Sequence, residues 1–430
     1  MREAVVLAVF VVAYVLIATE RVHRVLAALA GAAAMLLIGA LPWRTALFSG
    51  TAGIDWNVIG LLFGMMVVVS VLAETGAFDA VAIAAVHVTR GRPFLLLSFL
   101  VVVTAVASAA LDNVTTVLLL APVTLVVCTR LGLPPVTFLI AEVFASNVGG
   151  MATLIGDPPN IIVGSRAGLT FDQFVVTLGP LTVVLLGVLL LVLRLVFAGA
   201  LRDARPVAVD LAELSPRAAI TDLRLLVVSV AVLVVMLVGF VLHPVLHLAP
   251  SVVALVGALV LVALSGLGPA RFLQQVEWST LLFFVGLFVM VGALIEAGWV
   301  ERLAQGVASV FGDHLLMTST VILGLSATVG GIVDNIPFVA TMAPLTEDLV
   351  ADYAGDPDSV ALWWALVAGA DLGGNLTAVG ASANVVVLAV AARAGHRIGF
   401  WQFTRYGLVV TAVTVGIAWV WLWLRFFAFG

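Results

Sequence analysis

The sequence has no lysine, one cysteine and few charges of any kind. Lysine and arginine together number 19, and all 19 are arginines. Charged side chains make up 10% of the 430 residues. A soluble domain has about 25% charged residues. The single thiol, Cys128, excludes an intrachain disulfide and a metal site built from several thiolates. No phosphate-binding loop or nucleotide motif is present, so ATP does not drive this chain directly.

Apolar residues dominate the chain instead. They make up 63% of it and give a mean hydropathy of +1.26, which indicates a polytopic membrane protein. Runs of about 17 to 25 residues, long enough to cross a bilayer, fall at 3–19, 25–41, 56–74, 137–163, 178–199, 223–243, 248–266, 278–297, 361–392 and 403–428. The first run has no cleavage site behind it, and we interpret it as a retained span.

One polar hexapeptide occurs twice in this apolar background. Leu111-Asp112-Asn113-Val114-Thr115-Thr116 is followed 222 residues later by Val333-Asp334-Asn335-Ile336-Pro337-Phe338. Asp55-Trp56 and Glu277-Trp278 share the same offset, and the pairs further along differ by 224. Such regularity predicts a duplication, with repeats at 1–199 and 222–430 joined by a cytoplasmic linker at 200–221. Five crossings in each repeat is an odd number, so the second repeat is inverted relative to the first.

Each repeat has a pair of apolar arms that meet at the Asp-Asn sequence. The arms are 93–110 with 114–130, and 315–332 with 336–350. They predict two re-entrant helical hairpins, at about 93–130 and 315–350, with their tips at mid-membrane. The segments 77–90 and 299–312, which are polar on one face, are expected to lie along the membrane surface.

The fourth run of each repeat is interrupted by glycines and, in the first copy, by two prolines. These residues make a continuous helix costly, and we predict helices broken at about 137–166 and 361–396. Broken helices expose backbone groups and half-helix dipoles that can bind a solute or an ion. The residues involved are Asn147, Thr153, Gly156, Asp157, Asn160, Asp371, Asn375, Thr377, Gly380 and Asn384.

Four carboxylates are predicted at the same depth: Asp112, Asp157, Asp334 and Asp371. Such a group can hold a proton or a cation inside the membrane. Asp112 and Asp334 can alternatively act as helix N-caps. We expect Asp112 or Asp334 to matter most for coupling and Asp371 least, because an amide, Asn147, stands at the counterpart position. Glu142 either joins the cluster or pairs with a hydroxyl group.

At these residues the chain resembles the ion transporter superfamily. Its hairpin tip Leu111-Asp112-Asn113-Val114-Thr115-Thr116 and the stretch from Gly149 to Ile162 look like the branch that holds arsenite permeases (ArsB), the melanosomal P protein and NhaD-type antiporters. The resemblance implies a scaffold and a transport domain, elevator movement and a homodimer. By position it implies a site at Asp112, Asn113, Thr115, Thr116, Gly156, Asp157, Asn160, Asp334, Asn335, Thr377 and Asn384.

The sequence therefore predicts an all-α polytopic secondary transporter in the plasma membrane, not an enzyme. Proton-coupled efflux of arsenite or antimonite is the first hypothesis, followed by sodium/proton antiport and by uptake of an anion such as a dicarboxylate. The coupling ion is H⁺ or Na⁺, no other cofactor or metal is expected, and no nucleic acid partner is predicted. The sequence does not decide whether a soluble ATPase subunit binds. An intramembrane aspartic protease and a passive channel explain the matched breaks less well.

Arginine placement predicts the orientation. Thirteen arginines fall on one side of the predicted spans. Five fall on the other: Arg2, Arg44, Arg166, Arg302 and Arg425. The richer side is expected to be cytoplasmic, which places both termini outside the cytoplasm.

Overall fold

A computed structural model describes residues 2–18, 21–49, 52–204, 215–311, 314–353 and 355–428, and all the regular secondary structure in these ranges is helical. Eight of the described helices are long and apolar enough to cross a membrane. The all-α multi-pass prediction is confirmed. Residues 205–214 of the predicted linker lie outside the described part of the chain. Its two ends form the short helices α11 (Ala198–Asp203) and α12 (Pro216–Ala219).

Within the described residues, the first repeat contains ten helices. They are α1 (Arg2–Ala18), α2 (Arg24–Leu37), α3 (Trp43–Phe48), α4 (Trp56–Ala73), α5 (Ala77–Thr89), α6 (Pro93–Ala110), α7 (Asn113–Leu131), α8 (Pro135–Gly150), α9 (Pro158–Ala167) and α10 (Phe171–Val196). The predicted fifth span, 178–199, begins earlier than expected, at Phe171. Thr170 and Gln173 form a capping box there, which fixes the helix start.

The second repeat follows the same order. Its helices are α13 (Leu223–Leu246), α14 (Pro250–Ser265), α15 (Pro269–Leu273), α16 (Trp278–Glu296), α17 (Trp299–Phe311), α18 (Leu315–Leu325), α19 (Gly331–Val333), α20 (Asn335–Asp352), α21 (Ala361–Gly373), α22 (Ser382–Arg393) and α23 (Phe400–Leu422). Between α18 and α19 the chain forms a π-helical turn, η2 (Ser326–Gly330). A 3₁₀ turn, η3 (Pro357–Val360), precedes α21, and a π turn, η4 (Trp423–Phe427), ends the last helix.

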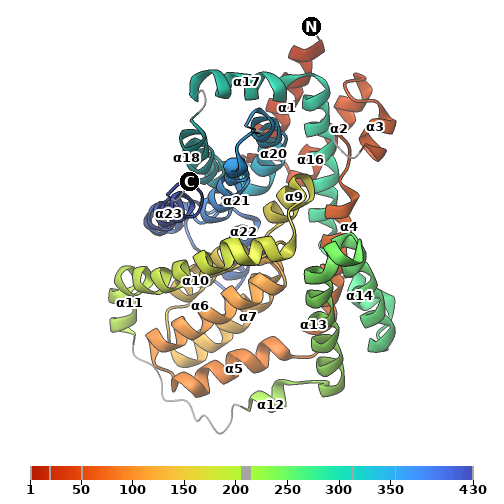
Figure 1. The fold of residues 1–430 in the computed structure, drawn as a ribbon. Coiled ribbons are helices and arrows are strands. Elements are labelled where there is room, and N and C mark those ends of the chain that lie inside the picture. Colours follow the sequence, from red (N-terminus) through yellow and green to blue (C-terminus); the bar gives the residue numbers. More distant parts are fainter. Residues whose placement is uncertain are drawn as a thin grey trace.

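Four of the described helices, α2, α4, α14 and α16, form a column in which the repeats exchange partners. Helix α16 packs on α2, and α4 packs on α14, so each pair joins the two repeats. Glycines allow the close approach: a Cβ at Gly64 would lie 2.7 Å from the backbone of Ala254, and one at Gly286 would lie 2.7 Å from that of Ala28. Figure 1 shows this column, with α1 and α13 beside it, on the right of the view.

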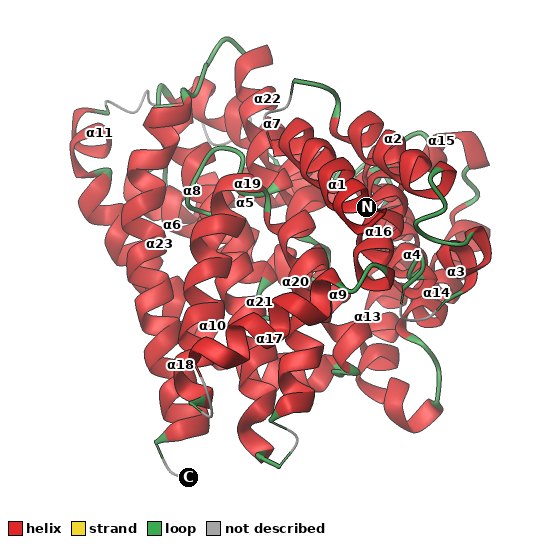
Figure 2. Ribbon diagram, turned by 90° about the horizontal axis from the view of Figure 1, so that it is seen from above, coloured by secondary structure: helices red, strands yellow, loops and turns green. Residues whose placement is uncertain are grey.

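The hairpins and broken helices make up the rest of the molecule, and they exchange partners in the same reciprocal way. Helix α7 of the first hairpin packs on α22, and α20 of the second packs on α9. Figure 2 shows the column helices α2, α4, α14 and α16 on one side and α6, α8, α10 and α23 on the other. Helices α5 and α17 lie at opposite ends of the view in Figure 1, in line with the inverted repeat.

The hairpin arms are longer than their re-entrant role suggests. Helices α6 and α7 have 18 and 19 residues, about 27 Å each at 1.5 Å per residue, which is enough to cross a bilayer. Length alone would therefore count them as two more spans. Their tip is instead buried against the break between α8 and α9, where the side chain of Asn113 is 1% exposed.

Two corresponding glycines bring backbones together where the broken helices meet the hairpins. A Cβ at Gly149 would lie 2.2 Å from the carbonyl oxygen of Ala105, and one at Gly373 would lie 2.6 Å from the Cα of Ala327. We expect Gly149→Ala and Gly373→Ala each to lower the melting temperature of the purified protein by several degrees, since overpacking costs about 1–3 kcal/mol.

The control for this prediction is Gly187→Ala on α10, where an added Cβ would meet no atom within 4 Å. Alanine favours a helix over glycine by about 0.5–1 kcal/mol, so this variant is expected to melt at the same or a higher temperature. Equal melting temperatures for Gly149→Ala and Gly187→Ala would contradict the tight contact.

Candidate functional site

The two hairpin tips have the same local structure. Asp112 and Asp334 have φ values of 155° and 118°, a region that residues other than glycine rarely occupy. The Asp112 carboxylate accepts hydrogen bonds from the backbone N–H of Thr115 at 2.8 Å and from its hydroxyl at 2.6 Å. Asp334 accepts from the backbone N–H of Ile336 at 3.1 Å. Both aspartates are therefore N-caps, as the alternative interpretation of the sequence predicted.

The first broken helix is interrupted between α8, which ends at Gly150, and α9, which begins at Pro158. The amide of Asn160 donates to the carbonyl oxygens of Gly150 at 3.0 Å and Thr153 at 2.8 Å. The Thr153 hydroxyl donates to the carbonyl of Ala109 in the hairpin arm at 2.6 Å. Asn160 and Thr153 thus stabilise the break and tie it to the first hairpin.

The second break, between α21 and α22, has the same bonds. Asn384 donates to the carbonyls of Gly374 at 2.7 Å and Thr377 at 2.8 Å, and the Thr377 hydroxyl donates to the carbonyl of Gly331 at 2.6 Å. The sequence predicted carbonyl groups free to bind a cation. At both breaks the asparagine amides occupy two of these carbonyls, because broken helix ends need hydrogen-bond partners when they are buried.

Side-chain amides connect the two repeats. Asn113 Nδ2 donates to Asn147 Oδ1 at 3.1 Å and to Asp157 Oδ2 at 2.5 Å. Asn147 Nδ2 donates in turn to Asn375 Oδ1 at 3.0 Å and Asn384 Oδ1 at 3.2 Å. The backbone of the second tip joins the same region, where the N–H of residue 335 donates to the carbonyl of residue 380 at 3.0 Å. One buried polar network therefore contains both tips and both breaks.

Asp157 and Asp371 are the carboxylates without a capping role. Their exposed fractions are 1% and 0%. Asn160 lies beside Asp371, but its side-chain N–H groups donate to the carbonyls of Gly150 and Thr153. Within the described part of the chain, no hydrogen-bond donor reaches either oxygen of Asp371 or Oδ1 of Asp157.

A buried carboxylate oxygen without a hydrogen-bond donor is costly in a medium of low dielectric constant, and the two side chains have three such oxygens: Oδ1 of Asp157 and both oxygens of Asp371. A bound proton or small cation removes that cost. The geometry therefore favours Asp157 and Asp371 for this chemistry, where the sequence favoured Asp112 and Asp334. The reason is capping: the hairpin aspartates already have backbone donors. The sequence offered the N-cap role as an alternative to coupling but could not decide between the two.

The structure brings the predicted site residues together. Asn113, Asn147, Asp157, Asn160, Asn375 and Asn384 form the side-chain hydrogen bonds of the network. Asn335 and Gly380 join it through the backbone, and the hydroxyls of Thr153 and Thr377 tie the breaks to the hairpins. Gly156 packs against Gly150 in the first break, and Asp371 is buried in α21 without a side-chain hydrogen bond among the described residues. Thr115 serves the Asp112 cap, and Thr116 is buried. Glu142 lies apart from the network and accepts a hydrogen bond from the Thr124 hydroxyl at 2.6 Å.

Sequence reasoning missed Arg24, which it counted among the cytoplasmic loop arginines. Arg24 is the first residue of α2, and its Nη1 donates to the hydroxyl of Ser382 at 2.6 Å and lies 3.7 Å from Asp334 Oδ2. Its guanidinium lies over the ring of Phe283 at 5.6 Å. A column helix thus places a positive charge at the second tip. The only sequence signal was an arginine at the start of an apolar run.

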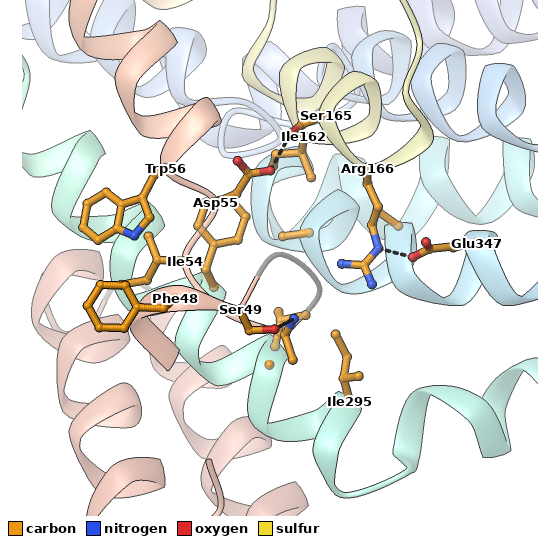
Figure 3. A pocket seen from close by; sticks show the side chains of 17 residues that line it. Phe48, Ser49, Ile54, Asp55, Trp56, Ile162, Ser165, Arg166, Ile295 and Glu347 are labelled. Atoms are coloured by element: carbon orange, nitrogen blue, oxygen red, sulfur yellow. Dashed lines mark hydrogen bonds and ion pairs between the residues drawn. The ribbon is translucent and has the colours of Figure 1, made fainter. Parts of the chain in front are cut away.

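A separate cavity of about 340 Å³ lies between the column, the end of α9 and α20 (Figure 3). Asp55 at the start of α4 accepts a hydrogen bond from Ser165 at 2.6 Å, and Arg166 forms an ion pair with Glu347 at 2.6 Å. None of the predicted site residues lines it. The match between Asp55 and Glu277 in the repeats was the signal here, but it predicted no role.

Comparisons with known proteins agree on the class of protein. The family model CitMHS, described as "Citrate transporter", matches residues 14–369. An uncharacterized transporter of Mycobacterium bovis is 53% identical over 425 residues and 99% of each chain. The 46 kDa membrane protein of Mycobacterium leprae is 48% identical over 424 residues, again 99% of each chain.

Two further proteins are more distant. The human P protein is 33% identical over 95% of this chain, which spans 58% of the P protein's length. The crystal structure of the YdaH transporter of Alcanivorax borkumensis has a TM-score of 0.60, 18% identity, and covers 92% of this chain and 89% of its own. At that identity it shows the fold alone. The predicted resemblance to the P protein branch is confirmed, and this multi-pass membrane protein belongs to the CitMHS citrate transporter family of the ion transporter superfamily.

Proposed function

We propose that this transporter is a secondary active carrier that exports a small inorganic solute, arsenite or antimonite, in exchange for protons. The observation that supports this proposal is the buried pair of Asp157 and Asp371 among side-chain amides. One aspartate comes from each repeat, and the pair offers a proton site at the point where the repeats meet. Coupling by an ion gradient requires such a site inside the membrane.

The surrounding amides suit an uncharged solute. Arsenite at neutral pH is the neutral trihydroxide, whose hydroxyl groups can hydrogen-bond to carboxylate and amide groups. Asn375 Nδ2 and Asn335 Nδ2 are buried donors, and Asn113 Oδ1 is a buried acceptor, to which no partner is assigned within the described residues. A neutral solute also avoids the repulsion that four aspartates would exert on an anion. No thiol is needed, so the lone Cys128 is consistent with this solute.

Two other solutes have specific support. The oxygen atoms Asn113 Oδ1, Asp157 Oδ1 and Asn160 Oδ1 are ligands of the kind that a hard cation prefers, which supports sodium/proton antiport. Arg24 beside Ser382 at the start of α22 supports an anion such as citrate, the solute named in the family description. A dicarboxylate bound to Arg24 would lie next to the carboxylate of Asp334, which already faces the arginine and would repel the anion.

Transport into everted membrane vesicles under an imposed pH gradient tests these assignments. Vesicles that hold the protein are compared with empty vesicles for proton-driven uptake of arsenite, sodium and citrate. Arsenite accumulation that collapses with the pH gradient is the expected result. Accumulation of sodium or citrate, with no movement of arsenite, would replace the proposed solute by the corresponding alternative.

We also propose the elevator architecture that the family resemblance implies. The column would be the scaffold, and the hairpins with the broken helices would be the moving part. The proposed repeats are 1–199 and 222–430, with hairpins at about 93–130 and 315–350 and broken helices at about 137–166 and 361–396. Homodimer formation and location in the plasma membrane belong to the same proposal.

Orientation can be tested with reporters. A reporter fused after Gly430 is expected to be active outside the cytoplasm, and one inserted in the 200–221 linker is expected to be active inside. The reason is the excess of arginine on the linker side, which holds although Arg24 lies at the site and not in a loop. Activity of both reporters on the same side would contradict the inverted repeat.

A further inference from the structure

A second buried carboxylate, Glu142, lies outside the central network. It is on α8, its side chain is 1% exposed, and its Oε1 accepts the hydrogen bond from Thr124 of α7. The other oxygen, Oε2, is buried with no hydrogen-bond partner among the described residues. A charged carboxylate with one neutral hydroxyl partner is a costly group in an apolar helix interface. Packing alone does not explain a charged carboxylate at this place, and a bound proton would remove its cost.

The second repeat shows which residue occupies the position of Glu142 in the other copy of the fold, and this tells us whether the fold needs a carboxylate there. At the offset of 224 that relates the broken helices, the counterpart of Glu142 is Leu366, and Leu366 is fully buried in α21. The hairpins are related by the offset of 222, so the counterpart of Thr124 is Thr346. The Thr346 hydroxyl donates a hydrogen bond to the carbonyl of Met342 in its own helix. An apolar side chain thus fills the same place in the same fold, so the fold does not require a carboxylate there.

The position of Glu142 also differs from that of the central pair. In the second repeat the carboxylate of the broken helix is Asp371, beside the break, and its first-repeat counterpart is Asn147. Glu142 precedes Asn147 by five residues, about 7.5 Å along α8 at 1.5 Å per residue. It is therefore displaced from the network toward the end of the hairpin that carries Arg130, the face proposed to be cytoplasmic.

The ionisable groups near Glu142 are few. Helix α8 packs against α6, α7, α10, α21, α22 and α23. Their ionisable residues are Asp112, Cys128 and Arg130 by α7, Asp172 and Arg194 on α10, Asp371 on α21, Arg393 on α22, and Arg405 and Tyr406 on α23. No arginine among the described residues forms an ion pair with the carboxylate.

We propose that Glu142 is a second proton-binding site, which takes up and releases one proton in each transport cycle between the central network and the cytoplasmic face. The proton binds to Oε2 and leaves from the same oxygen, while the hydrogen bond from Thr124 to Oε1 stays in place. This inference rests on the proposed proton coupling, and it assigns a proton to a residue outside the solute site.

The test does not depend on the solute. Full-length purified protein is titrated while infrared difference spectra record the C=O stretch of protonated carboxyl groups. We expect a band that disappears as the pH rises, that is absent in Glu142→Gln, and that moves in Thr124→Val because the hydroxyl bond is lost. The matched control is Thr346→Val, which removes the counterpart hydroxyl from a helix interface without a carboxylate and is expected to leave the band unchanged.

Vesicle measurements then connect the band to transport. Proton movement driven by arsenite, sodium or citrate is expected to fall at least tenfold in Glu142→Gln and Glu142→Leu, while the melting temperature of Glu142→Leu stays at or above that of the natural chain. Identical spectra for the natural chain and Glu142→Gln, or a band that persists at every pH, would overturn the proposal. So would normal proton movement in both variants. If arsenite is not transported but the band titrates, only the solute assignment fails.

Discussion

Replacing Asp157 by asparagine is expected to abolish gradient-driven transport while the protein stays folded. The substitution keeps the shape of the side chain and removes the group that can bind the proton. Asn113 Nδ2 donates to Asp157 at present, and an amide oxygen at the same place can accept that bond. An uncharged amide is also cheaper to bury than a carboxylate that has a donor on only one of its two oxygens. Uptake into vesicles is expected to fall at least about tenfold, which corresponds to about 1.4 kcal/mol, with an unchanged or higher melting temperature.

Asp371→Asn is expected to have the same effect, because we propose that the two carboxylates share one site. The double variant is then no worse than either single variant, since residues that act as a unit are not additive. Asp172→Asn, on the exposed first turn of α10, serves as the control and is expected to transport normally. If Asp157→Asn kept the pH profile of the natural chain, the aspartate pair would not be the coupling site.

The hairpin tips and the helix breaks could be predicted, because polar residues, glycines and prolines interrupt the apolar sequence there. Asp112 and Asp334 stand out because a carboxylate is rare in an apolar run, and their equal spacing in two repeats identified the hairpin tips. Glycines and prolines identified the broken helices for a similar reason, since few residues disfavour a helix so strongly. Each of these signals depends on the residue itself and on its neighbours in the chain.

The roles within the site could not be predicted in the same way. Asp112 and Asp157 both stand directly before a helix, yet the first is bonded to the backbone of its own helix and the second is bonded to Asn113, 44 residues away. Asn160 was expected to bind the solute, but both of its N–H groups stabilise the break. Which donor reaches which acceptor depends on how the helices pack, and the repeat offset does not contain that information.

Arg24 is the clearest case of this kind. Its chain neighbours, Arg21 and His23, made it one of several polar residues between two spans. Packing of α2 on α16 places it instead beside Asp334 and Ser382. The corresponding helix of the other repeat, α14, begins with Pro250. Among the residues that the structure describes, the site therefore has one fixed positive charge, on the side of the second tip.

Replacing Arg24 by glutamine is expected to lower the stability of the protein and to reveal the charge of its solute. Removing one partner of a fully buried ion pair costs about 3–5 kcal/mol. The Arg24 side chain is 26% exposed and its Nη1 lies 3.7 Å from Asp334, so we expect a smaller loss, about 1–3 kcal/mol. Arg24→Gln combined with Asp334→Asn is expected to recover the melting temperature, because neither charge is then left unpaired.

Transport by this double variant distinguishes the two kinds of solute. A neutral solute such as arsenite does not need the guanidinium, so its proton-driven uptake is expected to stay within about threefold of the natural rate, below 1 kcal/mol. An anion would lose the Arg24 guanidinium, and its uptake is expected to fall by about one to two orders of magnitude, because a hydrogen bond to a charged partner contributes about 1.5–3 kcal/mol. Arg44→Gln, at an exposed position on α3, is the control for a lost positive charge. Strong loss of arsenite uptake in the stable double variant, with Arg44→Gln unaffected, would contradict the neutral-solute assignment and favour an anion bound between Arg24 and the start of α22.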